Sequence, residues 1–147
     1  MDNKEFRQTI DKCLLQNEFK KSGKYYYKGT DEVICSLGLQ RSSYSDCYYI
    51  NVGLIIRALN PDLGYPRDVD GDIRGRFSIE ANGKKVDCFV VDEIHDTEVL
   101  INSIEKNISY WTSSTLTIKA LKKLLDDEPI RLFQTRLLAK KYLGIEE

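Results

Sequence analysis

The sequence predicts a single α+β domain spanning residues 1–147, with an antiparallel sheet of four to five strands, one N-terminal helix and about three C-terminal helices. Three observations predict this class. Apolar and polar side chains alternate over much of residues 24–91, a pattern typical of strands. Apolar side chains recur at helical spacing on both sides of that stretch. Strands grouped along the chain and joined by short turns pair antiparallel, which favours α+β over a parallel α/β sheet.

The first predicted element is an amphipathic helix that begins near Asp2 or Asn3 and fades near Asn17. The side chain of Asp2 or of Asn3 can accept a hydrogen bond from the free amides of the first helical turn. The residues up to the Ser22-Gly23 pair are expected to form a connection. The apolar face of the helix consists of Phe6, Ile10, Cys13 and Leu14.

Three strands are expected next. Residues 24–28 contain three consecutive tyrosines, and aromatic residues favour strands. Residues 32–40 alternate with period two, which is the clearest strand signal in the chain. A polar break over residues 41–46 separates this strand from another long one over residues 47–57.

The second half of the sheet follows a loop at residues 60–71 that contains two prolines and several aspartates. Alternation over residues 73–80 predicts a strand. Asn82-Gly83 predicts a type I′ turn because both residue types tolerate positive φ. A returning strand over residues 84–91 completes the hairpin.

The C-terminal third reads as helices, the first of which is capped by Asp96. Residues 113–115 are expected to open the second helix, and residues 127–129 to end it. Pro129 suits the first turn of a last helix that ends at Gly144. One sheet face should be covered by helices and the other partly open. The side chains expected to face inward are Leu100, Ile101, Ile104, Ile108, Trp111, Leu116, Ala120, Leu121, Leu124, Ile130, Phe133, Leu137 and Tyr142.

Composition excludes several classes of protein. The formal net charge of -1 lacks the basic excess of a general nucleic-acid binder. The four cysteines show no paired spacing and there is one histidine, so we expect reduced, buried thiols, no zinc site and no cofactor. There is no secretory signal and no apolar run near the roughly 20 residues that span a bilayer, so we expect a cytoplasmic protein without membrane contact.

The acidic segment Asp68–Arg76 resembles a calcium-binding loop in its alternate aspartates, but Ile79 occupies the position where such a loop needs a glutamate. We therefore expect a turn whose aspartates accept hydrogen bonds from backbone amides. Arg74 and Arg76 should point to one side of their strand. They either grip a carboxylate or phosphate or pair with nearby acids such as Asp87, and we favour pairing.

A second polar set lies within strand-like sequence. If the strand faces align, amide and guanidinium groups share one surface that suits an anion, a peptide or a partner protein. The alternative is that the amides satisfy cross-strand hydrogen bonds on a wet face. The candidate ligand-binding residues are Gln40, Ser42, Asn51, Arg74 and Arg76.

Four segments together resemble the bacterial family known as domain of unknown function 4304: residues 23–27, 39–45, 48–53 and 72–76. The resemblance implies a small bacterial cytoplasmic protein and brings no catalytic residues. It places recurrent polar positions of the family at the five candidate residues above.

Two functions from different classes follow, together with a weaker third. The first is a non-enzymatic binding module, for instance an interaction or immunity-type protein, supported by outward tyrosines and by the absence of a known catalytic motif. The second is an enzyme or sensor for a phosphate- or carboxylate-bearing ligand. It would use Arg74 and Arg76 as the clamp and Asp70 or Asp72 as acid/base or metal ligand. The third is RNA binding through tyrosine stacking. Oligomeric state is not indicated.

Overall fold

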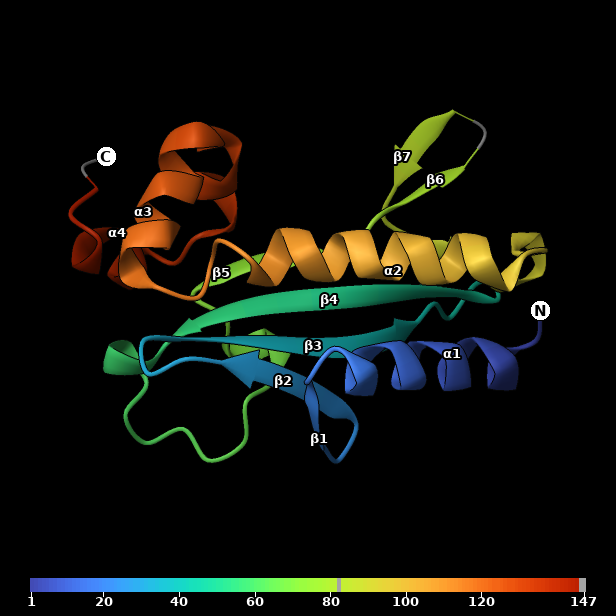
Figure 1. Cartoon of the computed structure of the whole chain (residues 1–147). Coiled ribbons are helices and arrows are strands. Elements are labelled where there is room, and N and C mark those ends of the chain that lie inside the picture. The colour runs from blue at the N-terminus through green and yellow to red at the C-terminus, as the bar shows by residue number, and fades with distance from the viewer. Residues whose placement is uncertain (82, 146–147) are drawn as a thin grey trace.

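The computed structural model describes residues 1–81 and 83–145 and has the predicted α+β architecture (Figure 1). Within these residues, a six-stranded antiparallel sheet runs in the order β1-β2-β3-β4-β5, and β8 also pairs with β4. The strands are β1 (Lys20–Ser22), β2 (Tyr25–Gly29), β3 (Val33–Arg41), β4 (Cys47–Ile56), β5 (Ile73–Arg76) and β8 (Phe89–Val90). A separate hairpin pairs β6 (Ile79–Ala81) with β7 (Lys84–Val86).

The helices lie before and after the strands in sequence, as predicted. The α-helices are α1 (Asn3–Gln16), α2 (Thr97–Thr112), α3 (Ile118–Asp127) and α4 (Leu137–Tyr142). Four 3-10 helices are η1 (Arg57–Leu59), η2 (Asp68–Asp70), η3 (Val91–Glu93) and η4 (Pro129–Gln134). Strand β1 was expected to be part of a connection.

The caps of α1 and α2 follow the sequence prediction. Asp2 accepts a hydrogen bond from the backbone N–H of Glu5 (2.8 Å), and Asp96 accepts one from that of Glu98 (2.9 Å). Each cap satisfies an amide that has no partner within its helix. The predicted apolar face of α1 is buried: Phe6, Ile10, Cys13 and Leu14.

One face of the sheet packs against both α1 and α2 and holds the core. Strands β3 and β4 pair over nine residues, so their apolar side chains alternate in phase. Phe6 of α1 stacks on Tyr48 of β4 with ring centroids 4.8 Å apart. Trp111 of α2 packs on Gly75 of β5, where an added Cβ would lie 2.3 Å from the indole ring. The strand register places Tyr48 and Gly75 on the same face.

The opposite face is partly covered by the segment that contains η2. The backbone oxygen of Asp68 approaches Gly53 so closely that an added Cβ there would lie 2.2 Å from it. The side chain of Asp68 meets Gly38 of the neighbouring strand in the same way, at 2.5 Å. The two glycines therefore let this segment lie directly on the strands. The remainder of this face carries buried Ile34 and Ile55 at one end and polar side chains at the other.

Two predicted strands are wrong as single elements, because each is divided between the main sheet and the hairpin. Residues 73–80 split at Phe77 and Ser78 into β5 and β6, and residues 84–91 split into β7 and β8. Phe77 is fully buried. The amide of Asn107 on α2 accepts a hydrogen bond from the N–H of Ser78 (2.9 Å) and donates one to its C=O (2.7 Å). These contacts turn the chain out of the sheet. Asn82 of the predicted turn lies outside the described residues, whereas Gly83 has a φ of 76°.

Two helix predictions also need correction. Helix α3 is capped by Thr117, not by residues 113–115, and Thr115 is buried with its hydroxyl on the carbonyl of Trp111. The last helix divides into η4 and α4 because Thr135 bridges to Ile73 of β5. A single helical phase therefore does not hold across this segment, although Gly144 has the φ of 73° expected at its end. The side chains wrongly expected to face inward are exposed: Ile130, Phe133, Leu137 and Tyr142.

All four cysteines are free thiols, and Cys13, Cys35 and Cys47 are buried. Burial raises the pKa of Cys35 to about 12. In the part of the chain that the structure describes, no helix combines the length and the apolar character needed to cross a bilayer.

Candidate functional site

Three side chains from neighbouring strands form a hydrogen-bonded row on the sheet face opposite α1 and α2. The amide nitrogen of Asn51 on β4 donates to the side-chain oxygen of Gln40 on β3 (2.9 Å). The amide oxygen of Asn51 accepts from Nε of Arg76 on β5 (3.0 Å). Asn51 lies directly opposite Arg76 in the register of β4 and β5. The predicted gathering of amide and guanidinium groups on one surface is therefore observed for these three residues. The alternative expectation, that the amides satisfy cross-strand hydrogen bonds, is observed as well.

Arg76 is held on two further sides. Its Nη1 lies 3.1 Å from Oδ2 of Asp87, which is the cross-strand acid that the sequence indicated. Its guanidinium carbon lies 4.1 Å from the centroid of the Tyr49 ring, within the range of a cation–π contact. Two of its five N–H donors are thus used, and the side chain remains 40% exposed. Arg76 is positioned by its neighbours and still accessible.

The other two predicted site residues do not join this row. Arg74 shares the face of Arg76, opposite Gly53, and is exposed. Burial raises the pKa of Asp68, and the positive charge of Arg74 opposes that rise. Ser42 lies beyond the end of β3, where its hydroxyl accepts a hydrogen bond from the N–H of Tyr44 (3.2 Å). Ser42 therefore belongs to the turn between β3 and β4.

The aspartates of the 68–72 segment are anchored separately. Asp70 forms an ion pair with Arg67 (3.0 Å). Asp72 is fully buried, accepts from the N–H of Ile56 (2.7 Å) and lies 3.1 Å from Nε of Arg136, while burial raises its pKa. Residues 1–81 and 83–145 contain no group of three or more His, Cys, Asp or Glu side chains placed to hold a metal ion. The aspartates thus join loops to the sheet.

A pocket of about 540 Å³ opens between α2, η4 and the hairpin of β6 and β7, and Arg76 reaches it from β5. Figure 1 shows the hairpin standing away from α2. The charged side chains of the lining are four cations and one acid: Arg76, Lys85, Lys106, Arg131 and Glu80. The rest of the lining is uncharged and mixes polar and apolar side chains: Ser78, Ile79, Val99, Asn102, Ser103, Asn107, Tyr110 and Trp111. We call it the hairpin pocket.

Arg131 forms the rigid end of the hairpin pocket. Its guanidinium lies 4.5 Å from the centroid of the Trp111 ring, and its Nε donates to the hydroxyl of Tyr110 (2.8 Å). The Tyr110 hydroxyl also bonds to Glu128 (2.8 Å), and burial together with this bond raises the pKa of Tyr110. Because Gly75 has no side chain, the indole ring of Trp111 can lie directly on β5. The cation is thereby fixed against an aromatic wall.

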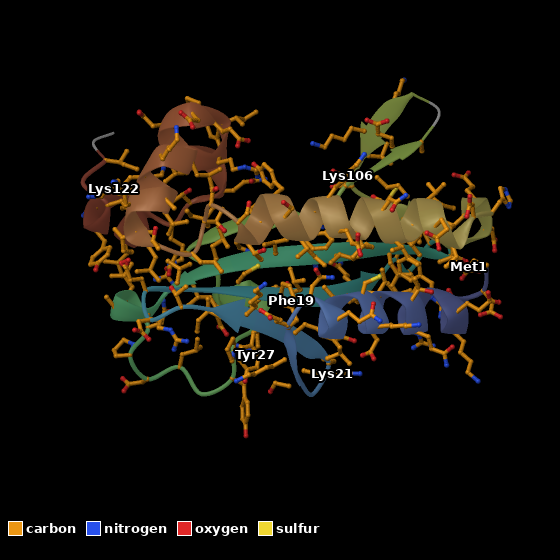
Figure 2. All side chains as sticks on the ribbon, viewed as in Figure 1. Met1, Phe19, Lys21, Tyr27, Lys106 and Lys122 are labelled. Carbon is orange, nitrogen blue, oxygen red and sulfur yellow. The ribbon has the colours of Figure 1, made fainter. Side chains whose placement is uncertain are left out.

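The other two cations of the hairpin pocket are without such ties. Within residues 1–81 and 83–145, neither Lys85 nor Lys106 makes a side-chain hydrogen bond or ion pair. Glu80 lies across the hairpin from Lys85 but is not within ion-pair distance of it. Figure 2 shows Lys106 on the side of α2 that faces the hairpin. The guanidinium groups of Arg76 and Arg131 pair with Asp87 and Glu128, whereas the two lysines leave six ammonium donors without a partner in the described residues.

Residues 10–124 match the profile of the family described as domain of unknown function, DUF4304. The chain belongs to this family. No curated protein and no solved structure matches it. The DUF4304 match runs from the middle of α1 to Leu124 within α3, and so includes the row of Gln40, Asn51 and Arg76 and both lysines of the hairpin pocket. Arg131 lies beyond it.

Sequence reasoning found Arg76 but missed the rest of the pocket in this DUF4304 chain. Lys85, Lys106 and Arg131 are far apart in sequence, and each resembles an ordinary solvated cation. They meet because the hairpin leaves the sheet at Ser78 and η4 docks beside β5. The one available sequence signal was the Asn107 amide on an otherwise apolar helix face, which marks a buried polar contact.

Proposed function

We propose that this protein is a binding module for a small ligand bearing a phosphate or carboxylate group, and that the ligand occupies the hairpin pocket. The observation that carries the proposal is that Lys85 and Lys106, which have no hydrogen-bond or ion-pair partner in residues 1–81 and 83–145, line one cavity together with Arg76 and Arg131. A dianionic group between the two lysines would balance their charge and form charge-assisted hydrogen bonds.

The proposed site keeps Arg76 from the clamp expected from the sequence, loses Arg74 and adds three other cations. Arg74 is exposed on the sheet face and does not line the hairpin pocket, whereas Arg76 does. The acids expected to act in a reaction, Asp70 and Asp72, do not line it either and are engaged elsewhere. The geometry therefore favours ligand binding by cations over acid–base chemistry at this site.

The test measures the thermal stability of the wild-type protein with inorganic phosphate, citrate and chloride at equal ionic strength. A ligand that binds only the folded state adds about 2.7 kcal/mol at a concentration of about 100 times its Kd. We expect phosphate or citrate to raise Tm where chloride does not. We expect Lys85→Gln combined with Lys106→Gln to weaken that binding at least about tenfold, since each charge-assisted hydrogen bond contributes about 1.5–3 kcal/mol.

The matched control removes two exposed lysines of α3, Lys119→Gln with Lys122→Gln, and should bind the anion like the wild type. Lys122 lies on α3, well away from Lys106 (Figure 2). If neither anion stabilises the wild type, or if both double variants lose binding equally, the proposed pocket is wrong.

A second candidate function is protein interaction, which the C-terminal segment favours. Phe133 is 90% exposed and Ile130 is 74% exposed. They are three residues apart in η4 and thus on one side of that 3-10 helix. Large exposed apolar side chains that occur together are typical of interaction sites.

The matching test compares co-purification of a protein partner from the native host by the wild type, by Ile130→Ser with Phe133→Ser, and by the control Tyr44→Ser. Tyr44 is 97% exposed in the turn between β3 and β4. Loss of the partner in the double variant alone supports this function, and retention excludes it.

We further propose that the protein works in a bacterial cytoplasm. The free state of all four cysteines supports a reducing compartment.

A further inference from the structure

A second hollow lies on the side of the molecule away from the hairpin pocket. It is a groove of about 870 Å³ between α1 and the β1–β2 hairpin, and it extends to the end of β3. In Figure 2, Lys21 marks this side and Lys106 marks the side of the hairpin pocket. The charged side chains of the groove are five cations and one acid: Lys4, Arg7, Lys21, Lys24, Arg41 and Asp11.

The one acid of this groove is already engaged. Asp11 accepts hydrogen bonds from the hydroxyl of Tyr26 (2.6 Å) and from Nζ of Lys21 (3.0 Å), which together hold the pKa of its carboxyl below the ordinary value. Arg41 forms an ion pair with Asp46 (2.6 Å) outside the groove. Asp11 and Asp46 thus neutralise Lys21 and Arg41, and the positive charges of Lys4, Arg7 and Lys24 are not balanced by an acid of the groove.

Three cations of the groove have no carboxylate partner within the described residues. Arg7 has one hydrogen bond, to the backbone oxygen of Asn3 (3.4 Å), and Lys24 lies 5.5 Å from the centroid of the Tyr25 ring. The side chain of Lys4 makes neither a hydrogen bond nor an ion pair there. All three are exposed. They are free to exchange water for an anionic ligand.

The cations are arranged along two walls and do not converge on a point. Lys4, Arg7 and Asp11 follow one another at helical spacing along one side of α1, over about 10 Å. Lys24 lies on the opposite wall, in the turn of the β1–β2 hairpin. A single compact anion cannot contact all of these positions, whereas a ligand with charges spaced along a chain can.

The tyrosines that line the groove offer no exposed ring for a base to stack on. Tyr26 and Tyr48 are 5% and 4% exposed, and Tyr48 is covered by Phe6. No aromatic face is thus free for a base to stack on, which removes the usual route to base preference in single strands. The exposed cations are therefore the lining groups suited to a phosphate backbone.

We propose that this groove binds a chain of phosphates, in the form of inorganic polyphosphate or a single-stranded nucleic-acid backbone, without base preference. The net charge of -1 does not oppose this, because it is a sum over the whole chain. Residues 86–105 hold six acids and no lysine or arginine, and none of those acids lines the groove.

The test follows the fluorescence anisotropy of a labelled 15-nucleotide oligothymidine, with inorganic polyphosphate, oligocytidine and orthophosphate as competitors at equal phosphorus. We expect binding at low salt that weakens on the order of 20-fold from about 50 mM to about 200 mM salt, as three phosphate contacts to a single strand predict. Oligocytidine should compete like oligothymidine, and orthophosphate should compete far less. If polyphosphate competes, the groove recognises the chain of phosphates itself. If polyphosphate does not compete, the ligand is restricted to nucleic acid.

The decisive variant is Lys4→Glu with Arg7→Glu and Lys24→Glu, which should lose at least about tenfold in affinity. The matched control, Lys119→Glu with Lys122→Glu and Lys141→Glu, changes the net charge equally on exposed positions outside the groove and should retain most of the binding. Should the glutamate variant unfold, the corresponding glutamine variant serves in its place. Absence of binding by the wild type, or equal losses in both triple variants, overturns the proposal.

Discussion

Asp68 joins the segment before β5 to the sheet face that carries Gln40, Asn51 and Arg76. Its backbone oxygen lies against Gly53 and its carboxylate against Gly38, so the segment before β5 is pressed onto β3 and β4. The side chain is 5% exposed. Burial raises the pKa of this carboxyl because a desolvated charge is unfavourable, and Arg74 offsets only part of the cost.

This burial predicts a pH-dependent effect of Asp68→Asn. Because the folded-state pKa of Asp68 lies above its ordinary value of 3.8, folding favours the protonated form. Its contribution to stability is therefore present below pH 3.8 and is lost as pH rises through the folded-state pKa. At pH 7 the neutral amide should raise Tm by about 2–4 °C, which corresponds to roughly 1 kcal/mol in a domain of this length.

Thermal melts of the Asp68→Asn variant between pH 3 and pH 8 check this expectation. The gain should shrink as pH falls and vanish near the ordinary pKa of an aspartate. Asp62→Asn, at an exposed position of the same loop, should change Tm little at any pH. A lower Tm for Asp68→Asn at pH 7 would show that Arg74 and the local amides more than compensate for burial.

Single residues were predictable where one strand register determines their neighbours. Gln40, Asn51 and Arg76 meet because alternate side chains of paired strands share a face. Asp87, one of the acids expected as partners for Arg74 and Arg76, pairs with Arg76. The lysines of the hairpin pocket were not predictable, since their meeting depends on where the hairpin points after Ser78.

Secondary-structure elements were predictable where local pattern and tertiary contacts agree. Strands β3 and β4 have the expected bounds within one or two residues, because their alternation matches a sheet with one buried face. Alternation over residues 73–80 was equally regular, and yet β5 and β6 belong to different sheets. Period two records only that side chains alternate. It does not record which partner strand the backbone meets.

The C-terminal helices show the same limit at the level of a helix. Helical spacing placed Ile130, Phe133, Leu137 and Tyr142 on one inward face. The chain instead changes direction at Thr135, and all four side chains are exposed. A short 3-10 helix and the short α-helix after it do not share one helical face. Apolar residues spaced across the break between them therefore need not point the same way.

Across the whole molecule, the average charge concealed how charge is distributed. The net value of -1 correctly excludes a uniformly basic surface. It says nothing about the hairpin pocket or the groove beside α1, each of which gathers four or five cations against one acid. Sequence-based exclusion by net charge therefore applies to non-specific binding over the entire surface and leaves local sites untouched.

The buried cysteines provide a test of whether the whole chain unfolds as one unit. Cys13 lies on α1, Cys35 on β3 and Cys47 at the start of β4, and each is at most 5% exposed. If the domain is one cooperative unit, all three thiols become reactive only by global opening, which costs about 5–15 kcal/mol in typical proteins. Labelling with a thiol reagent at increasing urea concentrations, followed by peptide mass spectrometry, should give the same opening free energy for the three.

Cys88 is half-buried and should react before them, though slowly, because burial raises its pKa and the thiolate is the reactive form. A markedly lower opening free energy at Cys13 than at Cys35 would show that α1 detaches independently, and the phosphate-chain groove between α1 and the β1–β2 hairpin would then open with it.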